Sequence, residues 1–424
     1  MKTEPTDQFE EYRVLLARQE AMRLRQSLLG PAATAAGPGG AAPGADRLHD
    51  GADDRRLITE TLPLVTPFDR LIADLYAALF DQHPYLRGLF PDSMDFQQAH
   101  LERAFQYLID HLDHPDEVTA FCSRLGRDHR KLGVRPVHYE VFETALVEAL
   151  RRRAGRWWRQ DAEEAWQRML RRAVAAMVRG AEAALAERPF WHATVTEHQR
   201  PRPDLAVLRV SPAEPFPYHA GQYALLQSPL LTRAWRPFSV ACAPRPDGDL
   251  EFHVRRTGPG GVSDALVHRT RVGDPLLIGP AQGTMTLGDD DLQHDVAIAA
   301  SGTGWAGAKA LLQDLALARR RRPGLTARVF LGARTRDDLY DLAAVADLER
   351  RHPWLRTVAV TGEAAEGDAL AEAVARHADL ARGLFFVSGP PALAATVRRL
   401  RALGLPADRV RHDLIAPSSA APGA

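Results

Sequence analysis

The chain has 424 residues, of which 45% are hydrophobic and 25% charged, a composition typical of soluble globular proteins with more than one domain. Lys and Arg together number 54, as do Asp and Glu, so no net charge would recruit nucleic acid or an anionic membrane. The two cysteines, Cys122 and Cys242, exclude a disulfide framework and are fewer than the about four thiolates that an iron–sulfur cluster needs. Any metal that carries electrons here must therefore have other ligands.

The beginning of the chain lacks the features of a targeting segment. Its first seven residues contain no apolar core of a signal peptide, and no run of about eighteen apolar residues occurs in the sequence. We therefore predict a cytoplasmic protein without a membrane partner.

Residues 1–52 are predicted to form an arm outside the folded domains. Residues 8–29 lack Gly and Pro and favour a helix, whereas residues 30–51 are dense in Ala, Gly and Pro, as in a flexible linker. Three apolar residues of the predicted helix fall at heptad spacing: Leu15, Met22 and Leu29. The arm is interpreted either as a solvated helical tail or as a segment for self-association or for docking to a protein partner.

The region from Leu57 to Leu185 is predicted to be helical throughout, because apolar residues recur at steps of three and four. Breaks are expected at four prolines: Pro84, Pro91, Pro115 and Pro136. After Pro189 the pattern changes to short β runs separated by Pro and Gly, which favours an antiparallel barrel. From Asp295 onward, strands and helices alternate, as in a doubly wound parallel sheet.

This last region is predicted to contain four strands and four helices. The strands are expected at residues 296–300, 326–332, 356–361 and 384–388, and the helices at 305–318, 343–350, 367–379 and 391–403. The predicted fold is thus multidomain. Its parts are the arm at residues 1–52, an all-α domain at 53–188, a β-barrel at 189–292, an α/β domain at 293–418 and a tail at 419–424.

The helical domain carries a candidate haem ligand. The segment 125–139 resembles the proximal region of bacterial flavohaemoglobins, in which the ligating His is followed ten residues later by a Tyr, as His129 is by Tyr139. A globin holds its iron through one neutral imidazole, so the resemblance implies that His129 is the metal ligand.

The distal side of this pocket is predicted from spacing to the same pattern. His83 to Phe90 resembles the helix junction whose Phe packs on the haem, which gives Phe90 that role. Tyr76 lies fourteen residues earlier, where flavohaemoglobins carry a Tyr whose hydroxyl donates to the haem ligand.

The next distal position has three competing side chains: Gln97, Gln98 and His100. Gln97 is preferred because it precedes His129 by the family's 32 residues, and His100 remains the alternative. Leu101, one helical turn after Gln97, then lies over the ligand pocket.

Many flavohaemoglobins also place a Glu beside the proximal His. Glu182 lies within one residue of that register, but the ungapped match is Ala181. A network of His129, Tyr139 and Glu182 would make the imidazole more basic.

Motifs that resemble those of the ferredoxin reductase family follow in the expected order. In Arg236-Pro237-Phe238-Ser239 the resemblance implies that the Arg neutralises the FAD pyrophosphate, the aromatic ring stacks on the flavin and the Ser lies near flavin N5. Gly260-Gly261-Val262-Ser263 resembles a second phosphate cradle, and Gly221-Gln222-Tyr223 precedes both motifs in the order expected of that family's barrel.

The α/β region begins with a nicotinamide-binding pattern. Gly302-Thr303-Gly304 ends a predicted strand and opens a helix, so that its amides face a phosphate. Arg334 and Arg336 lie in the segment that contacts the adenosine ribose; they favour NADPH, but similar arginines occur in relatives that use NADH.

Two departures from the family pattern concern hydride transfer. Ser388-Gly389-Pro390 replaces the usual Cys-Gly-Pro, and Ile415 stands where an aromatic residue commonly covers the flavin. Both predict slower hydride transfer or a more accessible flavin.

The resemblance implies a cytoplasmic enzyme with haem b, FAD and NADH or NADPH as cofactors. Flavohaemoglobins of this type oxidise nitric oxide to nitrate, with O2 and one NAD(P)H for two molecules of NO. The alternative is a haem-based sensor or electron-transfer module whose arm docks a partner and whose reductase keeps the haem ferrous. In either case the expected substrates are small molecules, with no nucleic acid involved.

Overall fold

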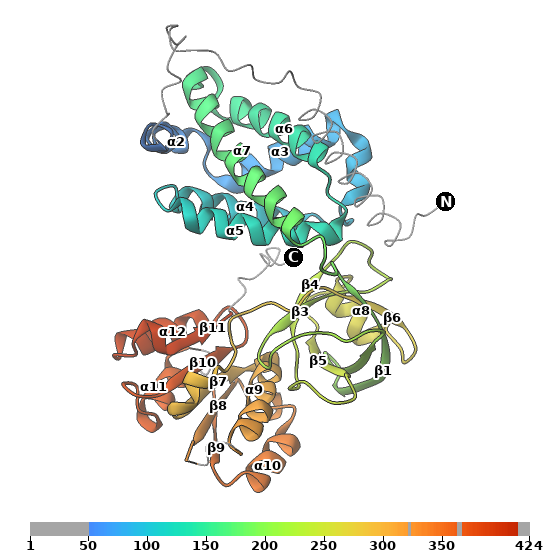
Figure 1. The fold of residues 1–424 in the computed structure, drawn as a ribbon, viewed down its shortest axis with the longest axis vertical. Helices are drawn as coiled ribbons and strands as arrows, with labels where there is room; N and C mark the ends of the chain where they lie inside the picture. Colours follow the sequence, from blue (N-terminus) through green and yellow to red (C-terminus); the bar gives the residue numbers. More distant parts are fainter. Residues whose placement is uncertain (1–50, 321–323, 363–366, 414–424) are drawn as a thin grey trace, which may run out of the picture. The chain divides into compact units, whose positions relative to one another are not determined.

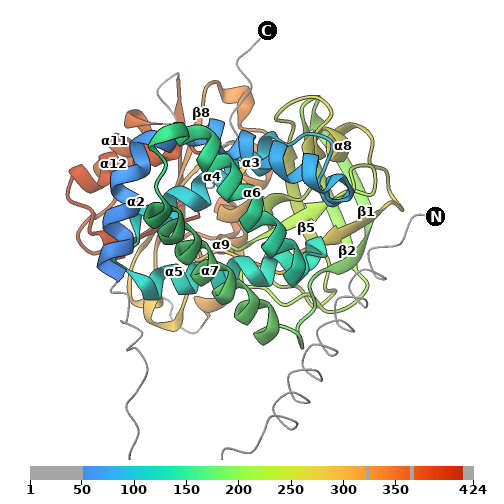
Figure 2. The ribbon, with the colours of Figure 1, turned by 90° about the horizontal axis from the view of Figure 1, so that it is seen from above.

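The computed structural model describes residues 51–320, 324–362 and 367–413, and the chain divides into two compact units after Pro189 (Figures 1 and 2). The first unit is helical, and the second contains a six-stranded and a five-stranded sheet. The predicted arm lies outside the described residues except for its last two positions, which begin the first described helix. No helix among the described residues is long and apolar enough to cross a membrane.

The first unit consists of helices connected by short turns. In chain order these are α2 (Gly51–Val65), α3 (Phe68–Gln82), η1 (Pro84–Leu89), α4 (Asp95–Asp110), α5 (Pro115–His129), η2 (Arg130–Leu132), α6 (Pro136–Ala154), η3 (Gly155–Trp157) and α7 (Gln160–Ala183). Prolines begin η1, α5 and α6, because a first-turn residue needs no intrahelical N–H partner. Pro63, by contrast, lies inside α2 near its end.

Two glycines allow α5 and α7 to pack with their backbones in contact, side by side in Figures 1 and 2. A Cβ added at Gly126 would lie 1.9 Å from the carbonyl oxygen of Met177, and one added at Gly180 would lie 2.1 Å from that of Ser123. Any larger residue would force the helices apart. The contact thereby holds the C-terminal turn of α5, which ends at His129.

The second unit begins with an antiparallel barrel. Its strands are β1 (Trp191–Arg202), β2 (Leu205–Pro212), β3 (Tyr223–Gln227), β4 (Arg236–Ser239), β5 (Leu250–Arg255) and β6 (Pro275–Ile278), and one helix, α8 (Val262–His268), follows β5. They pair in the order β4-β3-β6-β1-β2-β5. A bridge between Val240 and Phe252 joins the two ends of this order, which closes the barrel.

The rest of the second unit is a parallel sheet in the order β11-β10-β7-β8-β9. Its elements are β7 (Val296–Ser301), η5 (Gly302–Gly304), α9 (Trp305–Ala318), β8 (Ala327–Ala333), η6 (Arg336–Asp338), α10 (Leu342–Arg351), β9 (Leu355–Thr361), α11 (Asp368–His377), β10 (Leu384–Ser388), α12 (Leu393–Ala402), η7 (Ala407–Arg409) and β11 (Val410–His412), with η4 (Asp289–Gln293) preceding them. The four predicted strands and helices agree with this order within two residues, and β11 is an addition.

Alternating residues of the parallel strands bury two separate cores. Ile298 of β7 packs on the side of α9 and α10, whereas its neighbours Ala297 and Ala299 pack on the side of α11 and α12. The sheet is therefore covered on both faces, as the doubly wound prediction required. The predicted class, an all-α domain followed by a β-barrel and an α/β domain, is confirmed.

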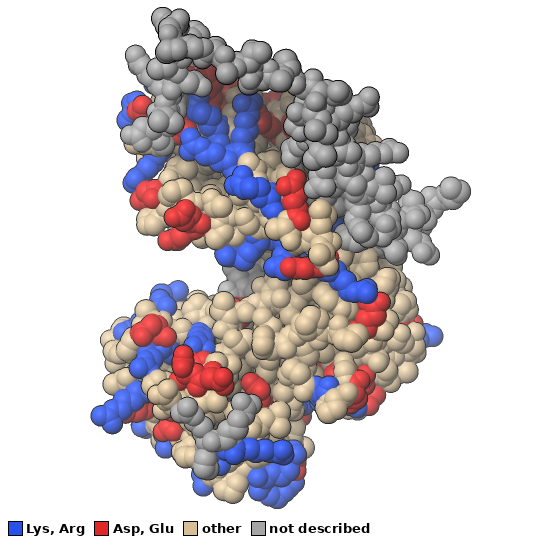
Figure 3. All heavy atoms as spheres, viewed as in Figure 1, with Lys and Arg blue, Asp and Glu red and all other residues tan. Residues whose placement is uncertain are grey.

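Charged side chains of both signs are spread over the described parts of the face in Figure 3, with uncharged surface between them. This distribution accompanies the equal numbers of acidic and basic residues in the sequence.

Candidate functional site

The proximal candidate, His129, is the last residue of α5 and is held by its own helix. Its Nδ1 donates to the carbonyl oxygen of Leu125, one turn earlier, at 2.8 Å. Burial lowers the pKa of His129, which keeps the imidazole neutral. A neutral ring oriented through Nδ1 leaves Nε2 as the nitrogen for a metal, as a haem ligand requires.

The residues of the predicted proximal network come from three helices, with His129 at the end of α5. Tyr139 lies in the first turn of α6 and packs, partly buried, against the helical core. Glu182 lies in the last turn of α7, and its side chain makes no hydrogen bond to any described residue. Because Leu125 already occupies His129 Nδ1, the role of Glu182 remains a prediction.

On the distal side, Tyr76 of α3 lies in an aromatic cluster. Its ring meets Phe90 edge-on with centroids 5.6 Å apart and stacks on Phe80 at 5.9 Å, and Phe80 in turn meets Phe90 at 5.3 Å. Burial raises the pKa of Tyr76, so its hydroxyl stays protonated. No described residue accepts a hydrogen bond from this hydroxyl, which leaves it available as a donor.

The structure separates the competing residues of α4. Gln97 has a buried Oε1 with no hydrogen-bond partner among the described residues. His100 is exposed, and its Nδ1 contacts the carbonyl oxygen of Phe96 at 3.0 Å. Leu101 packs partly buried against the core. A buried polar atom normally has a hydrogen-bond partner, so the unpartnered Gln97 Oε1 makes Gln97 the better distal candidate. A neutral imidazole and two polar groups without partners among the described residues are side chains that fit a haem with a small polar ligand.

The flavin-site motif, Arg236–Ser239, forms strand β4, which pairs with β3. Ser239 at the end of β4 pairs in register with Tyr223 of β3, whose hydroxyl donates to Gln282 at 3.1 Å. Burial lowers the pKa of Arg236 to about 10, which still leaves it cationic at neutral pH. A half-buried permanent cation beside the partly buried Phe238 fits a group that carries both a pyrophosphate and a planar ring.

The second glycine motif forms the turn before α8. Gly260 has φ +72°, a conformation that favours glycine, whereas a Cβ added at Gly261 would meet nothing within 4 Å. The Ser263 hydroxyl accepts from the backbone N–H of Thr257 at 3.1 Å. The turn is thus braced from within and open outside, as a phosphate cradle requires.

The flavin and nicotinamide motifs meet at Gly307 in the first turn of α9. A Cβ added there would lie 3.1 Å from Ser388 Oγ, 3.7 Å from Ser239 Oγ and 3.7 Å from Met285 Cε. Gly304, one turn earlier, has no room for a Cβ, which would lie 2.0 Å from the carbonyl oxygen of Ser388. These contacts bring Ser239 of the barrel and Ser388 of the parallel sheet to one place.

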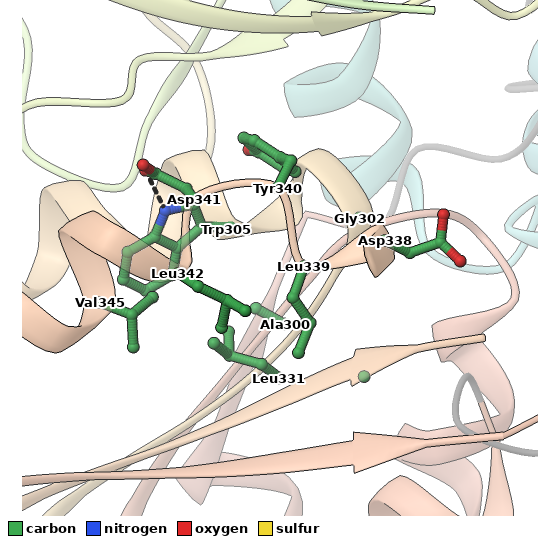
Figure 4. Close-up of a pocket in the computed structure, with 11 residues that line it drawn as sticks. Ala300, Gly302, Trp305, Leu331, Asp338, Leu339, Tyr340, Asp341, Leu342 and Val345 are labelled. Atoms are coloured by element: carbon green, nitrogen blue, oxygen red, sulfur yellow. Dashed lines mark hydrogen bonds between the residues drawn. The ribbon is translucent and has the colours of Figure 1, made fainter. Parts of the chain in front are cut away.

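A small cavity of about 20 Å³ is lined by residues of β7, β8 and the segment that leads into α10. Figure 4 shows the side chains that line it. Trp305 lines it, and its Nε1 donates to Asp341 Oδ2 at 2.7 Å.

In the segment after β8, the acidic residue Asp338 has partners among the described residues, whereas the arginines do not. Asp338 accepts hydrogen bonds from the N–H and hydroxyl of Thr335 and pairs with Arg202 at 3.3 Å. Arg334 and Arg336 are exposed and have no described partner. The acid is therefore committed to the fold, and the two arginines are available for a ligand.

Comparison with known proteins identifies relatives of both parts of the chain. A globin family model matches residues 73–177. Flavohaemoproteins of Deinococcus radiodurans and Pseudomonas aeruginosa are each 25% identical to this chain over 86% of it, which covers 97% and 98% of those proteins. The chain belongs to the flavohaemoglobin family. Its fold resembles that of a flavohaemoglobin from Malassezia yamatoensis with bound FAD and haem, at 17% identity and TM-score 0.70, over 85% of this chain and 98% of that one.

This flavohaemoglobin also has relatives outside the family. The reductase component of propane 2-monooxygenase from Mycolicibacterium goodii is 32% identical over half of this chain and 63% of its own length. The match therefore leaves more than a third of that protein uncovered.

Two features of this flavohaemoglobin were missed or lie out of view. Met285, at the junction around Gly307, follows the barrel and carries no motif that would single it out. Ile415, predicted to stand over the flavin, and the heptad residues of the arm lie outside the described residues.

Proposed function

We propose that this flavohaemoglobin holds haem b, FAD and NADH or NADPH, and that it oxidises nitric oxide to nitrate with O2. The main support is the set of polar atoms without protein partners in the helical unit. His129 Nε2, the Tyr76 hydroxyl and Gln97 Oε1 have no hydrogen-bond partner among the described residues, while the surrounding side chains are packed. Such atoms suit a pocket that holds a metal on one side and a diatomic ligand on the other.

Each of the named site residues in the helical unit then has one role. His129 holds the iron through Nε2, and Leu125 keeps the ring oriented. When bound, the haem supplies O2 activation and the flavin converts a hydride into single electrons. Tyr76 donates a hydrogen bond to the small ligand, and Gln97 supplies a second donor once its amide turns by half a rotation.

In the reductase unit the residues bind and orient. Arg236 neutralises the FAD pyrophosphate, and Phe238 offers a face for the flavin ring. Ser239 and Ser388 come from different domains and meet at Gly307, which is the arrangement that a hydride donor and acceptor need. The missing side chain of Gly307 keeps this space open.

Nitric oxide consumption by the purified holoprotein tests the proposal. An NO electrode with NAD(P)H in air-saturated buffer should show rapid loss of NO, with nitrate as product and one NAD(P)H used per two NO. His129→Ala should lose the Soret band and this activity while it keeps FAD, and His100→Ala should keep both.

The opposite result is equally clear. If the haem is reduced by NAD(P)H but NO disappears no faster than with ferrous globin and an external reductant, the sensor or electron-transfer function replaces this one.

A further inference from the structure

A cluster of charged and polar side chains connects the barrel to the nicotinamide domain. Glu251 and His253 come from β5, Lys309 from α9, and Tyr340 and Asp341 from the segment before α10. They lie on one side of a polar cavity of about 230 Å³. Tyr340 ends the segment that resembles the adenosine-ribose contact, and no motif in the sequence includes the other four residues.

Glu251 is the centre of the cluster. Its Oε1 accepts from Lys309 Nζ at 2.7 Å and from His253 Nε2 at 2.9 Å, and its Oε2 lies 3.3 Å from Arg245 Nη2. Burial raises the pKa of Glu251, but the hydrogen bonds from His253 and Lys309 outweigh this and lower it to about 2. The carboxylate is therefore ionised, and its side chain is only 14% exposed.

A second set of contacts closes the cluster into a ring. Asp341 Oδ2 accepts from Trp305 Nε1 at 2.7 Å, as Figure 4 shows, and lies 3.7 Å from Lys309 Nζ. The hydroxyl of the adjacent Tyr340 is 2.7 Å from His253 Nδ1. His253 therefore links the Glu251 carboxylate to the Tyr340 hydroxyl through its two ring nitrogens. The chain of contacts thus leads from β5 to α9, to residues 340–341 and back to β5.

The helix held by this ring carries the reacting junction. Trp305 and Lys309 lie within the first two turns of α9, directly after the Gly302–Gly304 turn, and Gly307 between them faces Ser239 and Ser388. Further along, Gln313 Oε1 accepts from the backbone N–H of Ala243 in the barrel at 3.0 Å. The contacts therefore attach the nicotinamide end of α9 to the domain that holds the flavin motif.

Stability alone is a poor explanation for such a cluster. A buried ion pair often stabilises a protein no better than apolar residues of similar size, because both ions must leave water. An ion pair that also makes hydrogen bonds to both neighbouring domains fixes the position of one domain relative to the other. Hydride transfer is sensitive to such position, since a misplacement of about 1 Å can cost about a hundredfold in rate.

We propose that Glu251, Lys309 and Asp341 form a clamp that positions the nicotinamide domain for hydride transfer to the flavin. The proposal rests on the reductase part of the proposed function but not on the reaction with NO. All three are positioning residues, since they act through α9 and Trp305 on the reacting groups.

The test measures flavin reduction in the FAD-loaded holoprotein by anaerobic stopped flow with NADH and with NADPH. Glu251→Gln should lower the limiting rate of flavin reduction about tenfold or more, while the dissociation constant of the nicotinamide changes less than about threefold. Glu197→Gln is the matched control. Glu197 lines the same cavity and pairs with Arg209 at 3.2 Å, outside the clamp, so this variant should reduce its flavin at the wild-type rate.

A double variant separates position from folding. Glu251→Gln with Lys309→Met removes both members of the shortest ion pair together, and the two charges that lose a partner, Arg245 and Asp341, are each 24% exposed. The double variant should therefore fold and keep FAD while flavin reduction stays slow. Wild-type rates in FAD-loaded Glu251→Gln, or losses that only follow the loss of FAD, would overturn the clamp. Normal flavin reduction in the wild type without NO consumption would overturn the proposed reaction with NO and leave the clamp standing.

Discussion

The hydroxyl oxygens of Ser239 and Ser388, which belong to different domains, lie 3.7 Å and 3.1 Å from the position that a Cβ on Gly307 would occupy. Ser239 and Ser388 are 149 residues apart in the sequence, and both lie beside Gly307 in the first turn of α9. This relationship makes Gly307 the residue whose size decides how much room remains at the junction.

Gly307→Ala should therefore slow hydride transfer. The new methyl group would stand closer to Ser388 Oγ than nearly all Cβ contacts do, so Ser388 or the bound ring must move. We expect flavin reduction to slow by about tenfold, with FAD retained, in anaerobic stopped flow. Gly324→Ala is the control, because a Cβ there meets nothing within 4 Å. Equal rates in both variants would show that the space at Gly307 is not used.

Tyr76→Phe tests the distal hydroxyl. Loss of a hydrogen bond to a polar ligand should cost roughly 1.5–3 kcal/mol, so O2 should dissociate about ten- to a hundredfold faster. Stopped-flow displacement of O2 by CO measures this rate. Gln97→Ala should also accelerate dissociation, and His100→Ala should not, since His100 is exposed. An unchanged rate in Tyr76→Phe would transfer the role to α4.

Arg334 and Arg336 should decide how well the enzyme uses NADPH. Both are exposed and have no described partner, while Asp338 is committed to Thr335 and Arg202. Removal of either arginine should lower kcat/KM for NADPH by about tenfold and leave that for NADH nearly unchanged, because only NADPH carries the 2′-phosphate. Steady-state reduction of an artificial electron acceptor gives both values. Arg350→Ala, on α10, is the control, and parallel losses for both nucleotides would contradict the assignment.

Stability should depend on pH through Glu251. Its pKa falls from the ordinary 4.5 to about 2 on folding, so its contribution is complete above 4.5 and is lost as the pH falls from 4.5 through about 2. In urea unfolding, the gap between wild type and Glu251→Gln should be constant near neutral pH and should shrink on acidification. A gap that widens toward acid would show that the carboxylate is not held by its partners in the folded protein.

Local sequence determined most of the architecture and the chemical groups of this protein. Apolar steps of three and four predicted the helical unit, and prolines predicted breaks in it, three of which fall at the starts of η1, α5 and α6. The glycine motifs predicted turns at Gly260 and Gly302, and both residues have positive φ. These features are readable because each depends on neighbours within a few residues.

Tertiary structure decided what depends on the direction of side chains and on contacts between distant segments. Gln97 and His100 are both candidates for the distal position from the sequence. The packing of α4 buries the Gln97 Oε1 atom and exposes the His100 side chain. Glu251 and Lys309 are 58 residues apart and belong to different domains, so no local pattern links them. Their pairing arises because the barrel and α9 pack against each other, and packing is a property of the whole unit rather than of any segment.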